Sequence, residues 1–186
     1  MPRPPRVFVP GLSAHVFQRG HNKAPVFNED CDYRTFLWLV RDASHRFAVD
    51  VHGFAVMNNH YHLIATPGDD EALPAAMKAI DGGYTRYYNK KHDRLGTAWN
   101  ARYRAKLIDD ETYWLTCLRY VELNPVRAQL VRAPEEYQWT SYPVHAMGAF
   151  NDWLVPHQIY LQLGPTPGDR QRAYRALCAV SDTVAD

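Results

Sequence analysis

Alternation of apolar and polar residues predicts β-strands in four parts of the chain. The first three alternating stretches end at Gly20, Asn58 and Pro67, residue types that commonly bound strands. The fourth stretch is less regular. The first three predicted strands span residues 14–19, 49–57 and 60–66, and the fourth is expected within residues 99–108.

Apolar residues recur at a helical period in four further segments. Asn28 is the expected N-cap of the first helix, and Asp109 or Asp110 is that of the third. We expect the third helix to break at Asn124, because the residue before a proline avoids helical backbone angles. The predicted helices span residues 29–47, 72–89, 112–123 and 170–180.

The order of these elements, β-α-β-β-α-β-α, predicts an α+β fold with helices packed mainly on one face of an antiparallel sheet. The chain has 186 residues, of which 46% are hydrophobic, enough for the core of one domain of ordinary size. We expect this domain to span residues 1–148. Residues 149–186 are expected to form a partly helical extension that packs on the same domain.

Composition narrows the class of protein. The three cysteines are far apart and form no CxxC pair, which argues against a zinc knuckle or a disulfide framework and favours a reduced, cytosolic protein. No run of 18 apolar residues occurs, which argues against a membrane span. The first ten residues, rich in proline and arginine, are expected to be extended and lack the apolar stretch of a signal peptide.

Charge is distributed unevenly along the chain. The formal net charge is only +1, whereas residues 78–106 alone carry a local balance of +6. Tyrosine and tryptophan side chains alternate with these cations. Cations bind phosphates and aromatic faces stack on unpaired bases, so the stretch indicates a nucleic-acid surface. A solvated helix face beside ordinary core aromatics has the same composition and is the alternative.

His60 and His62 are two residues apart in a predicted strand, so both imidazoles point to the same face of the sheet. Neighbouring neutral imidazoles are a good start for a metal site. The same spacing also occurs in ordinary sheets, where one imidazole is exposed and the other packs with a satisfied hydrogen bond. The chain has nine histidines, so both interpretations stay open on the pair alone.

Tyr120 and Asn124 are four residues apart at the end of the third predicted helix, so they share one face. A tyrosine hydroxyl can attack phosphorus, and a nearby divalent cation can polarise the phosphate. The amide oxygen of Asn124 could join a histidine pair in binding Mg²⁺ or Mn²⁺. With twelve tyrosines in the chain, a core or surface role for Tyr120 is the alternative.

The ordered set of these motifs resembles the REP-associated tyrosine transposases, a branch of the single-strand HUH transposase superfamily. The resemblance covers about residues 2–145. Tyr61 departs from the family pattern, which most often has an aliphatic residue there, but it faces away from the histidines. The matching segments are residues 2–3, 15–20, 57–64, 84–89, 99–103, 119–126 and 139–142.

The resemblance implies a ferredoxin-like fold of the HUH endonuclease type. It implies metal-dependent cleavage and rejoining of single-stranded DNA at hairpins of repetitive extragenic palindromic (REP) type, through a 5′-phosphotyrosine. Tyr120 is then the nucleophile, and His60, His62 and Asn124 bind Mg²⁺ or Mn²⁺. It further implies a bacterial protein of the cytoplasm and nucleoid that acts as a monomer or homodimer. The residues expected to contact DNA are Arg19, Lys78, Arg86, Tyr87, Lys90, Lys91, Arg102 and Arg104.

Three other functions fit parts of the sequence. A domesticated nucleic-acid-binding module without cleavage activity would use the basic stretch, but it would not need the histidine pair and the tyrosine together. A zinc hydrolase would need a third strong ligand, and the sequence has no HExxH motif or cysteine cluster. A purely structural α+β domain leaves the ordered motifs unexplained.

Overall fold

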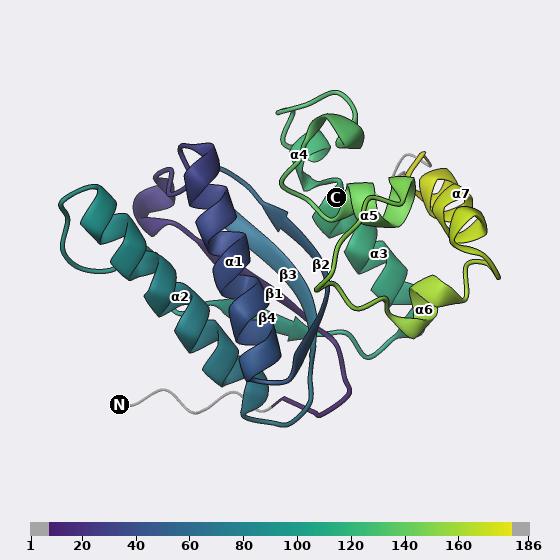
Figure 1. The fold of residues 1–186 in the computed structure, drawn as a ribbon, viewed down its shortest axis with the longest axis horizontal. Helices are drawn as coiled ribbons and strands as arrows, with labels where there is room; N and C mark the ends of the chain where they lie inside the picture. The colour runs from purple at the N-terminus through teal and green to yellow at the C-terminus, as the bar shows by residue number, and fades with distance from the viewer. Residues whose placement is uncertain (1–7, 180–186) are drawn as a thin grey trace.

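Four strands form one antiparallel sheet in the computed structural model, which describes residues 8–179 (Figure 1). The strands are β1 (Ala14–Arg19), β2 (Val49–Val56), β3 (His60–Pro67) and β4 (Arg104–Leu107). Their order across the sheet is β2-β3-β1-β4. This confirms the predicted α+β class and the ferredoxin-like arrangement that the family resemblance implied. Residues 1–7 of the N-terminal stretch that was expected to be extended lie outside the described residues.

Only the second half of the stretch expected to contain the fourth strand is extended. Trp99 makes an isolated bridge to Gly20, and its buried indole donates a hydrogen bond to the backbone oxygen of Asp81 at 3.1 Å. Asn100 donates its backbone N–H to the backbone oxygen of Arg19. These contacts hold the chain as a loop as far as Tyr103, and the strand expected within residues 99–108 is β4, in the second half of that stretch.

Three long helices occur where the pattern predicted them, and α7 corresponds to the fourth predicted segment, whose last residue, Val180, lies outside the described residues. The shorter helices α5 and α6 were not predicted, since four to six residues give too few turns for a period to be visible. The helices are α1 (Asp30–Arg46), α2 (Ala72–Lys91), α3 (Glu111–Glu122), α4 (Asn124–Arg127), α5 (Tyr142–Met147), α6 (Gln158–Leu161) and α7 (Pro167–Ala179), with 3-10 turns at His21–Lys23 and Pro134–Glu136.

Capping side chains define where the helices begin. The prediction that Asn28 caps α1 was wrong by one residue, because Glu29 is the N-cap. The Asp32 carboxylate accepts the backbone N–H groups of both residues, at 2.9 and 3.0 Å, and so extends the cap backwards. Asp110 caps α3 as expected and accepts the backbone N–H of Tyr113 at 2.7 Å.

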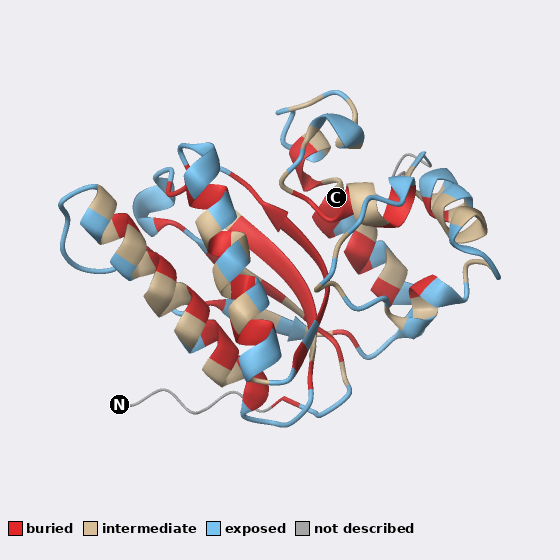
Figure 2. Cartoon of the chain, viewed as in Figure 1, coloured by how far each residue is buried: buried red, intermediate tan, exposed pale blue. Residues whose placement is uncertain are grey.

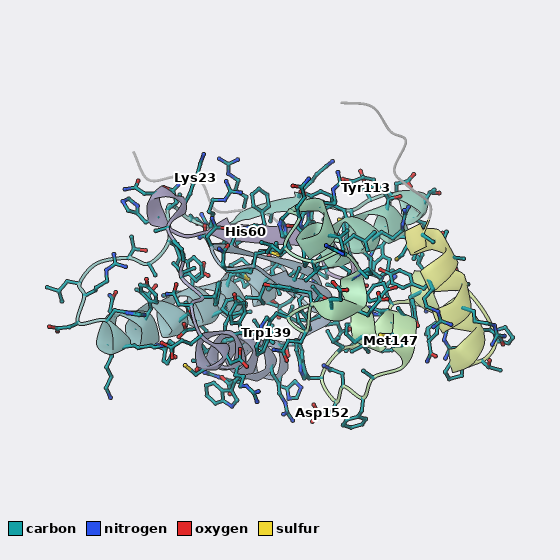
Figure 3. All side chains as sticks on the ribbon, turned by 90° about the horizontal axis from the view of Figure 1, so that it is seen from above. Lys23, His60, Tyr113, Trp139, Met147 and Asp152 are labelled. Atoms are coloured by element: carbon teal, nitrogen blue, oxygen red, sulfur yellow. The ribbon has the colours of Figure 1, made fainter. Side chains whose placement is uncertain are left out.

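Helices cover the two faces of the sheet unequally. α1 and α2 cover one face of the sheet along its length (Figure 2). Val16, Tyr61 and Leu63 belong to the core beneath them. α3 packs on the other face against β2 and β3, together with α5, α6 and α7. Figure 3 shows His60 and Tyr113 towards one side of the molecule and Trp139 and Asp152 towards the opposite side. The α3 face is therefore the one that carries the histidines.

Described residues of the predicted C-terminal extension pack against α3. Tyr160 of α6 and Tyr174 of α7 are buried in one cluster with Trp114 and Leu118. The division of the chain at residue 148 stays a prediction. Among residues 8–179, none of the helices has the length and apolarity that a bilayer crossing needs.

A close approach between α3 and β2 depends on Gly53. The register of β2 against β3 shifts between Val51 and Gly53, and a Cβ atom added to Gly53 would lie 2.4 Å from Leu118 Cδ1 and 3.2 Å from Ser141 Oγ. A side chain at this position would force the Leu118 side chain to move, and Leu118 is fully buried. The glycine thus sets how deeply the helix sits on the face that carries the histidines.

We predict that Gly53→Ala lowers the free energy of unfolding by about 1–3 kcal/mol, because the added methyl group overpacks the α3–β2 contact. Gly82→Ala is the matched control in α2, where a Cβ atom would meet only Arg86 Nη1 at 3.5 Å. The control should be neutral or stabilise by up to about 1 kcal/mol through helix propensity. Urea denaturation measures both, and equal stabilities of the two variants would contradict the proposed overpacking.

Candidate functional site

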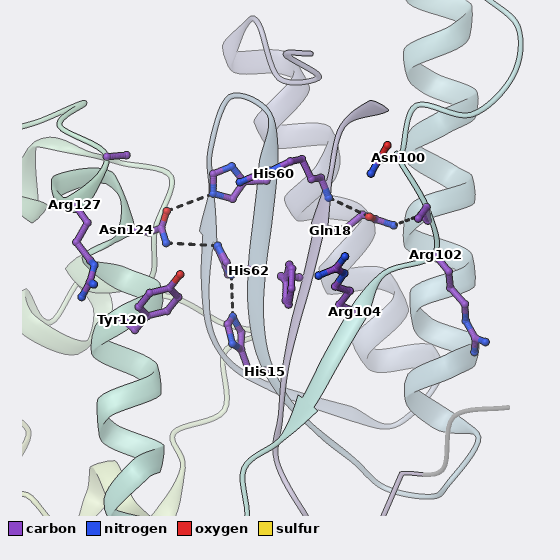
Figure 4. Close-up of a pocket in the computed structure, with 14 residues that line it drawn as sticks. His15, Gln18, His60, His62, Asn100, Arg102, Arg104, Tyr120, Asn124 and Arg127 are labelled. Carbon is purple, nitrogen blue, oxygen red and sulfur yellow. Dashed lines mark hydrogen bonds between the residues drawn. The ribbon is translucent and has the colours of Figure 1, made fainter. Parts of the chain in front are cut away.

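A cleft of about 590 Å³ opens on the sheet face that α3 only partly covers (Figure 4). Its floor is formed by β1 and β3, one wall by the C-terminal end of α3 with α4, and the other wall by the loop before β4. The cleft brings together His60, His62, Tyr120 and Asn124, the four residues predicted to carry the chemistry.

Strand register places the two histidines on the floor of the cleft. His60 pairs with Arg19 and His62 pairs with Phe17 on the neighbouring β1. Tyr61, between them, points to the opposite face, where it is fully buried and donates its hydroxyl to Asp81 Oδ1 at 2.7 Å. The predicted common direction of the two imidazoles follows from this alternation.

The break at Asn124 carries its amide to the histidine pair. α3 ends at Glu122, and a single turn, α4, begins at Asn124. Pro125 lies in the first turn of α4, where a backbone N–H would have no partner within the helix. Asn124 Oδ1 lies 3.3 Å from His60 Nε2, and Asn124 Nδ2 lies 3.5 Å from His62 Nε2. Three side chains from two segments 60 residues apart thus meet at one point.

The hydrogen bonds around His60 leave two acceptors facing each other. Asn59 Nδ2 donates to the Lys23 backbone oxygen, so Asn59 Oδ1 accepts the proton of His60 Nδ1 at 2.6 Å. The lone pair of His60 Nε2 then faces Asn124 Oδ1. Burial lowers the pKa of His60, so an imidazolium at this position is disfavoured. A cation held between the two atoms would satisfy both.

His15 orients His62 from the adjacent strand. Its Nε2 lies 2.8 Å from His62 Nδ1, and this pairing leaves His62 Nε2 directed at Asn124. Burial, with smaller contributions from its neighbours His15, His60 and Arg19, holds the pKa of His62 well below its usual value. Burial and the Lys106 ammonium lower the pKa of His15 to about 4. The imidazoles of His62 and His15 are therefore neutral near pH 7. For His62 this is the form that binds a metal ion.

Tyr120 stands beside these imidazoles within a single chain. Its ring meets His62 edge-on with centroids 5.8 Å apart, and it meets His15 at 6.0 Å. The side chain is 39% exposed, and Figure 4 shows its hydroxyl directed towards the histidine pair. The Arg127 guanidinium lies 5.2 Å from the ring centroid. Tyr120, Asn124 and Arg127 follow an i, i+4, i+7 spacing that the sequence displayed, although Arg127 was not predicted.

The donor set suits a hard or borderline divalent cation. The two imidazole nitrogens lie at one point with the Asn124 amide, whose oxygen is 3.3 Å from His60 Nε2 and whose nitrogen is 3.5 Å from His62 Nε2, and imidazole nitrogens with an amide oxygen are ligands that Mn²⁺ accepts. Within residues 8–179, no group of three or more His, Cys, Asp or Glu side chains is arranged to hold a metal ion. The group of His60, His62 and Asn124 is not one of these, because Asn124 contributes an amide.

The residues predicted to contact DNA divide between two faces. Arg19, Arg102 and Arg104 line the cleft with Tyr120. The other five lie on α2, which packs on the opposite face of the sheet. Two of these five contact Asp32, at 2.6 Å from Lys91 Nζ and 2.8 Å from the Tyr87 hydroxyl. The α2 residues that the fold does not bring to the cleft are Lys78, Arg86, Tyr87, Lys90 and Lys91.

A buried carboxylate fixes the end of α3. Glu122 is fully buried and accepts hydrogen bonds from Ser141 Oγ, from His145 Nδ1 at 2.6 Å and from the Tyr174 hydroxyl at 2.7 Å. The donors belong to the start of α5, to α5 itself and to α7. Glu122 lies two residues from both Tyr120 and Asn124, so this cluster determines where those side chains stand. Glu122 and Ser141 lie in the matching segments 119–126 and 139–142, but the sequence analysis predicted no contact between them.

Comparisons with known proteins identify the family of the chain and proteins of similar fold. The model of the IS200-like transposase family matches residues 8–124. A solved structure of a REP-associated tyrosine transposase bound to a REP hairpin superposes with a TM-score of 0.68 at 16% identity, covering 84% of this chain and 93% of that one. A tRNA(His) guanylyltransferase from Saccharomyces cerevisiae superposes with a TM-score of 0.50 at 11% identity, over 97% and 83% of the two chains. No curated protein sequence matches the chain.

We predict that Glu122→Ala lowers the free energy of unfolding by about 3–5 kcal/mol, because three buried donors lose their shared acceptor. Glu135→Ala is the matched control, since Glu135 is exposed. The control should stay within about 0.5 kcal/mol of the unsubstituted protein. Chemical denaturation measures both values. A loss below about 1 kcal/mol for Glu122→Ala would show that the cluster contributes little to stability.

Proposed function

The chain belongs to the IS200-like transposase family and is a DNA transposase, and from this premise we propose that Tyr120 cleaves and rejoins single-stranded DNA through a 5′-phosphotyrosine. The observation that carries the proposal is the position of Tyr120. Its ring contacts His62 and His15, and its hydroxyl is directed at the point where His60, His62 and Asn124 meet. A phosphate held at that point would be within reach of the phenol.

The proposed reaction exchanges one phosphodiester for another. The Tyr120 oxygen attacks phosphorus, the bond to the 3′ oxygen breaks, and the proton that leaves the phenol is balanced by the one that the 3′-hydroxyl gains. A second 3′-hydroxyl then attacks the phosphotyrosine and restores the tyrosine. The Arg127 guanidinium, 5.2 Å from the ring centroid, would stabilise the negative charge that develops on the phenol oxygen.

His60, His62 and Asn124 would hold a divalent cation, Mg²⁺ or Mn²⁺, through two imidazole nitrogens and an amide oxygen. The chemistry supplied by such an ion when bound is polarisation of the phosphate and neutralisation of charge in the transition state. His15 would keep the His62 tautomer that leaves Nε2 available, and Asn59 would do the same for His60.

We propose DNA hairpins with single-stranded flanks as the substrate, as for the REP-associated branch of the family. The similarity in fold to a transposase bound to a REP hairpin supports this choice. Arg19, Arg102 and Arg104 line the cleft and would contact backbone phosphates. All residues assigned to the chemistry belong to one chain, so a single copy would suffice for cleavage whether the protein is a monomer or a homodimer.

We predict that Tyr120→Phe abolishes a covalent protein–DNA adduct on denaturing gels while hairpin binding is retained. The substitution removes only the attacking oxygen. Tyr113→Phe is the matched control, since Tyr113 lies on the same helix and is 38% exposed against 39% for Tyr120. The control should form the adduct at the normal rate. An adduct that survives Tyr120→Phe rules out this nucleophile. Tight binding without an adduct in the unsubstituted protein would favour a non-cleaving binding module.

We predict that His60→Ala weakens binding of Mn²⁺ by at least about tenfold, since one of three protein ligands is lost. Titration followed by the electron spin resonance of free Mn²⁺ measures this without reference to activity. His45→Ala is the matched control, because His45 is exposed on α1, which covers the opposite face of the sheet. The ligand assignment is wrong if both variants bind Mn²⁺ equally well.

A further inference from the structure

Phe17 is an aromatic residue on the floor of the cleft that the hydrophobic cores do not use. It lies in the middle of β1, a central strand, and points to the face opposite Val16. Within residues 8–179 it belongs to neither of the two apolar clusters, although it is half-buried. The exposed part of its ring therefore faces the cleft, where a bound molecule could cover it.

Charged and aromatic side chains surround the Phe17 ring in one row across the sheet. Phe17 pairs with Arg104 of β4 on one side and with His62 of β3 on the other. The Arg104 guanidinium lies 5.9 Å from the ring centroid, and the His62 ring centroid also lies at 5.9 Å. The row therefore leads from an exposed cation, over an aromatic ring, to the proposed metal ligand.

Such a row matches the chemistry of one unpaired nucleotide. An aromatic ring on the open face of a four-stranded sheet stacks on a base that is not paired, and guanidinium planes extend the stack or hold the phosphate. A base in a duplex is already stacked and paired, so the site would select single-stranded DNA. The length of the row puts the stacked base next to the phosphate that Tyr120 would attack.

We infer that Phe17 is a stacking platform for an unpaired base adjoining the scissile phosphate. This inference rests on the proposed function, because it takes the strand to run through the cleft. Phe17 would bind the base, whereas the arginines of the cleft would bind the phosphates. Recognition of a base face is independent of base identity, so Phe17 would fix the position of the strand without reading its sequence.

The test compares two single-stranded probes of equal length and charge, dT20 and a fully abasic 20-mer, bound to the full chain carrying Tyr120→Phe. Phe17→Leu should weaken binding of dT20 by roughly 5- to 150-fold, the effect of losing one stacked base. Binding of the abasic 20-mer should stay unchanged. Phe17→Tyr should keep the preference for dT20. Fluorescence anisotropy measures the affinity of each protein for both probes.

Phe150→Leu is the matched control, since Phe150 is 91% exposed and lies outside the cleft. It should bind both probes as the parent does. The inference is overturned if Phe17→Leu weakens the two probes equally or weakens neither. If the binding of dT20 depends on Phe17 but the unsubstituted protein forms no covalent adduct, the stacking platform is supported and the proposed cleavage is rejected. If the unsubstituted protein forms the adduct but the binding of dT20 does not depend on Phe17, only the stacking platform is rejected.

Discussion

Alternation of side chains along β1 and β3 is the constraint on which the site depends. One set of residues, including Val16 and Tyr61, faces the core under α1 and α2, while the other set, including Phe17 and His62, faces the cleft. The hydrogen bond that the buried Tyr61 hydroxyl donates to Asp81 Oδ1 holds this register. A slip of one residue would bury two imidazoles and expose a tyrosine, so the fold and the chemistry are specified by the same contacts.

The second requirement is a fixed position for α3 over that face. Two contacts of different kinds supply it. The absence of a side chain at Gly53 lets the helix approach β2 closely, and the Glu122 carboxylate ties its C-terminal end to α5 and α7. Tyr120 and Asn124 lie at this end, each two residues from Glu122. Their placement is therefore a property of the whole described chain.

Much of the fold could be predicted because its signals are local. The period along β3 was enough to bring His60 and His62 to one face, and helical spacing was enough to align Tyr120 with Asn124. The roles of His15 and Phe17 could not be derived in this way, since they depend on which strands are neighbours and in which register. Glu122 was equally hidden: its donors lie 19, 23 and 52 residues further along the chain.

The basic stretch shows the limit of reasoning from composition. Its cations are close in sequence, but the sheet separates them, so that Arg102 and Arg104 reach the cleft while Lys91 is paired with Asp32 behind it. A count of charges cannot distinguish these two environments. Only the direction of each strand and helix assigns a cation to DNA or to the protein itself.

The Glu122 cluster also has a consequence for biosynthesis. A nascent chain emerges from the ribosome in order, so the helix that carries Tyr120 is made before any of the three hydrogen-bond donors that hold its end. Until Tyr174 has been translated, the Glu122 carboxylate lacks one of its donors, and the end of α3 that carries Tyr120 lacks its final support. The cleft would then reach its final geometry only late in synthesis, when nearly the whole chain has been made.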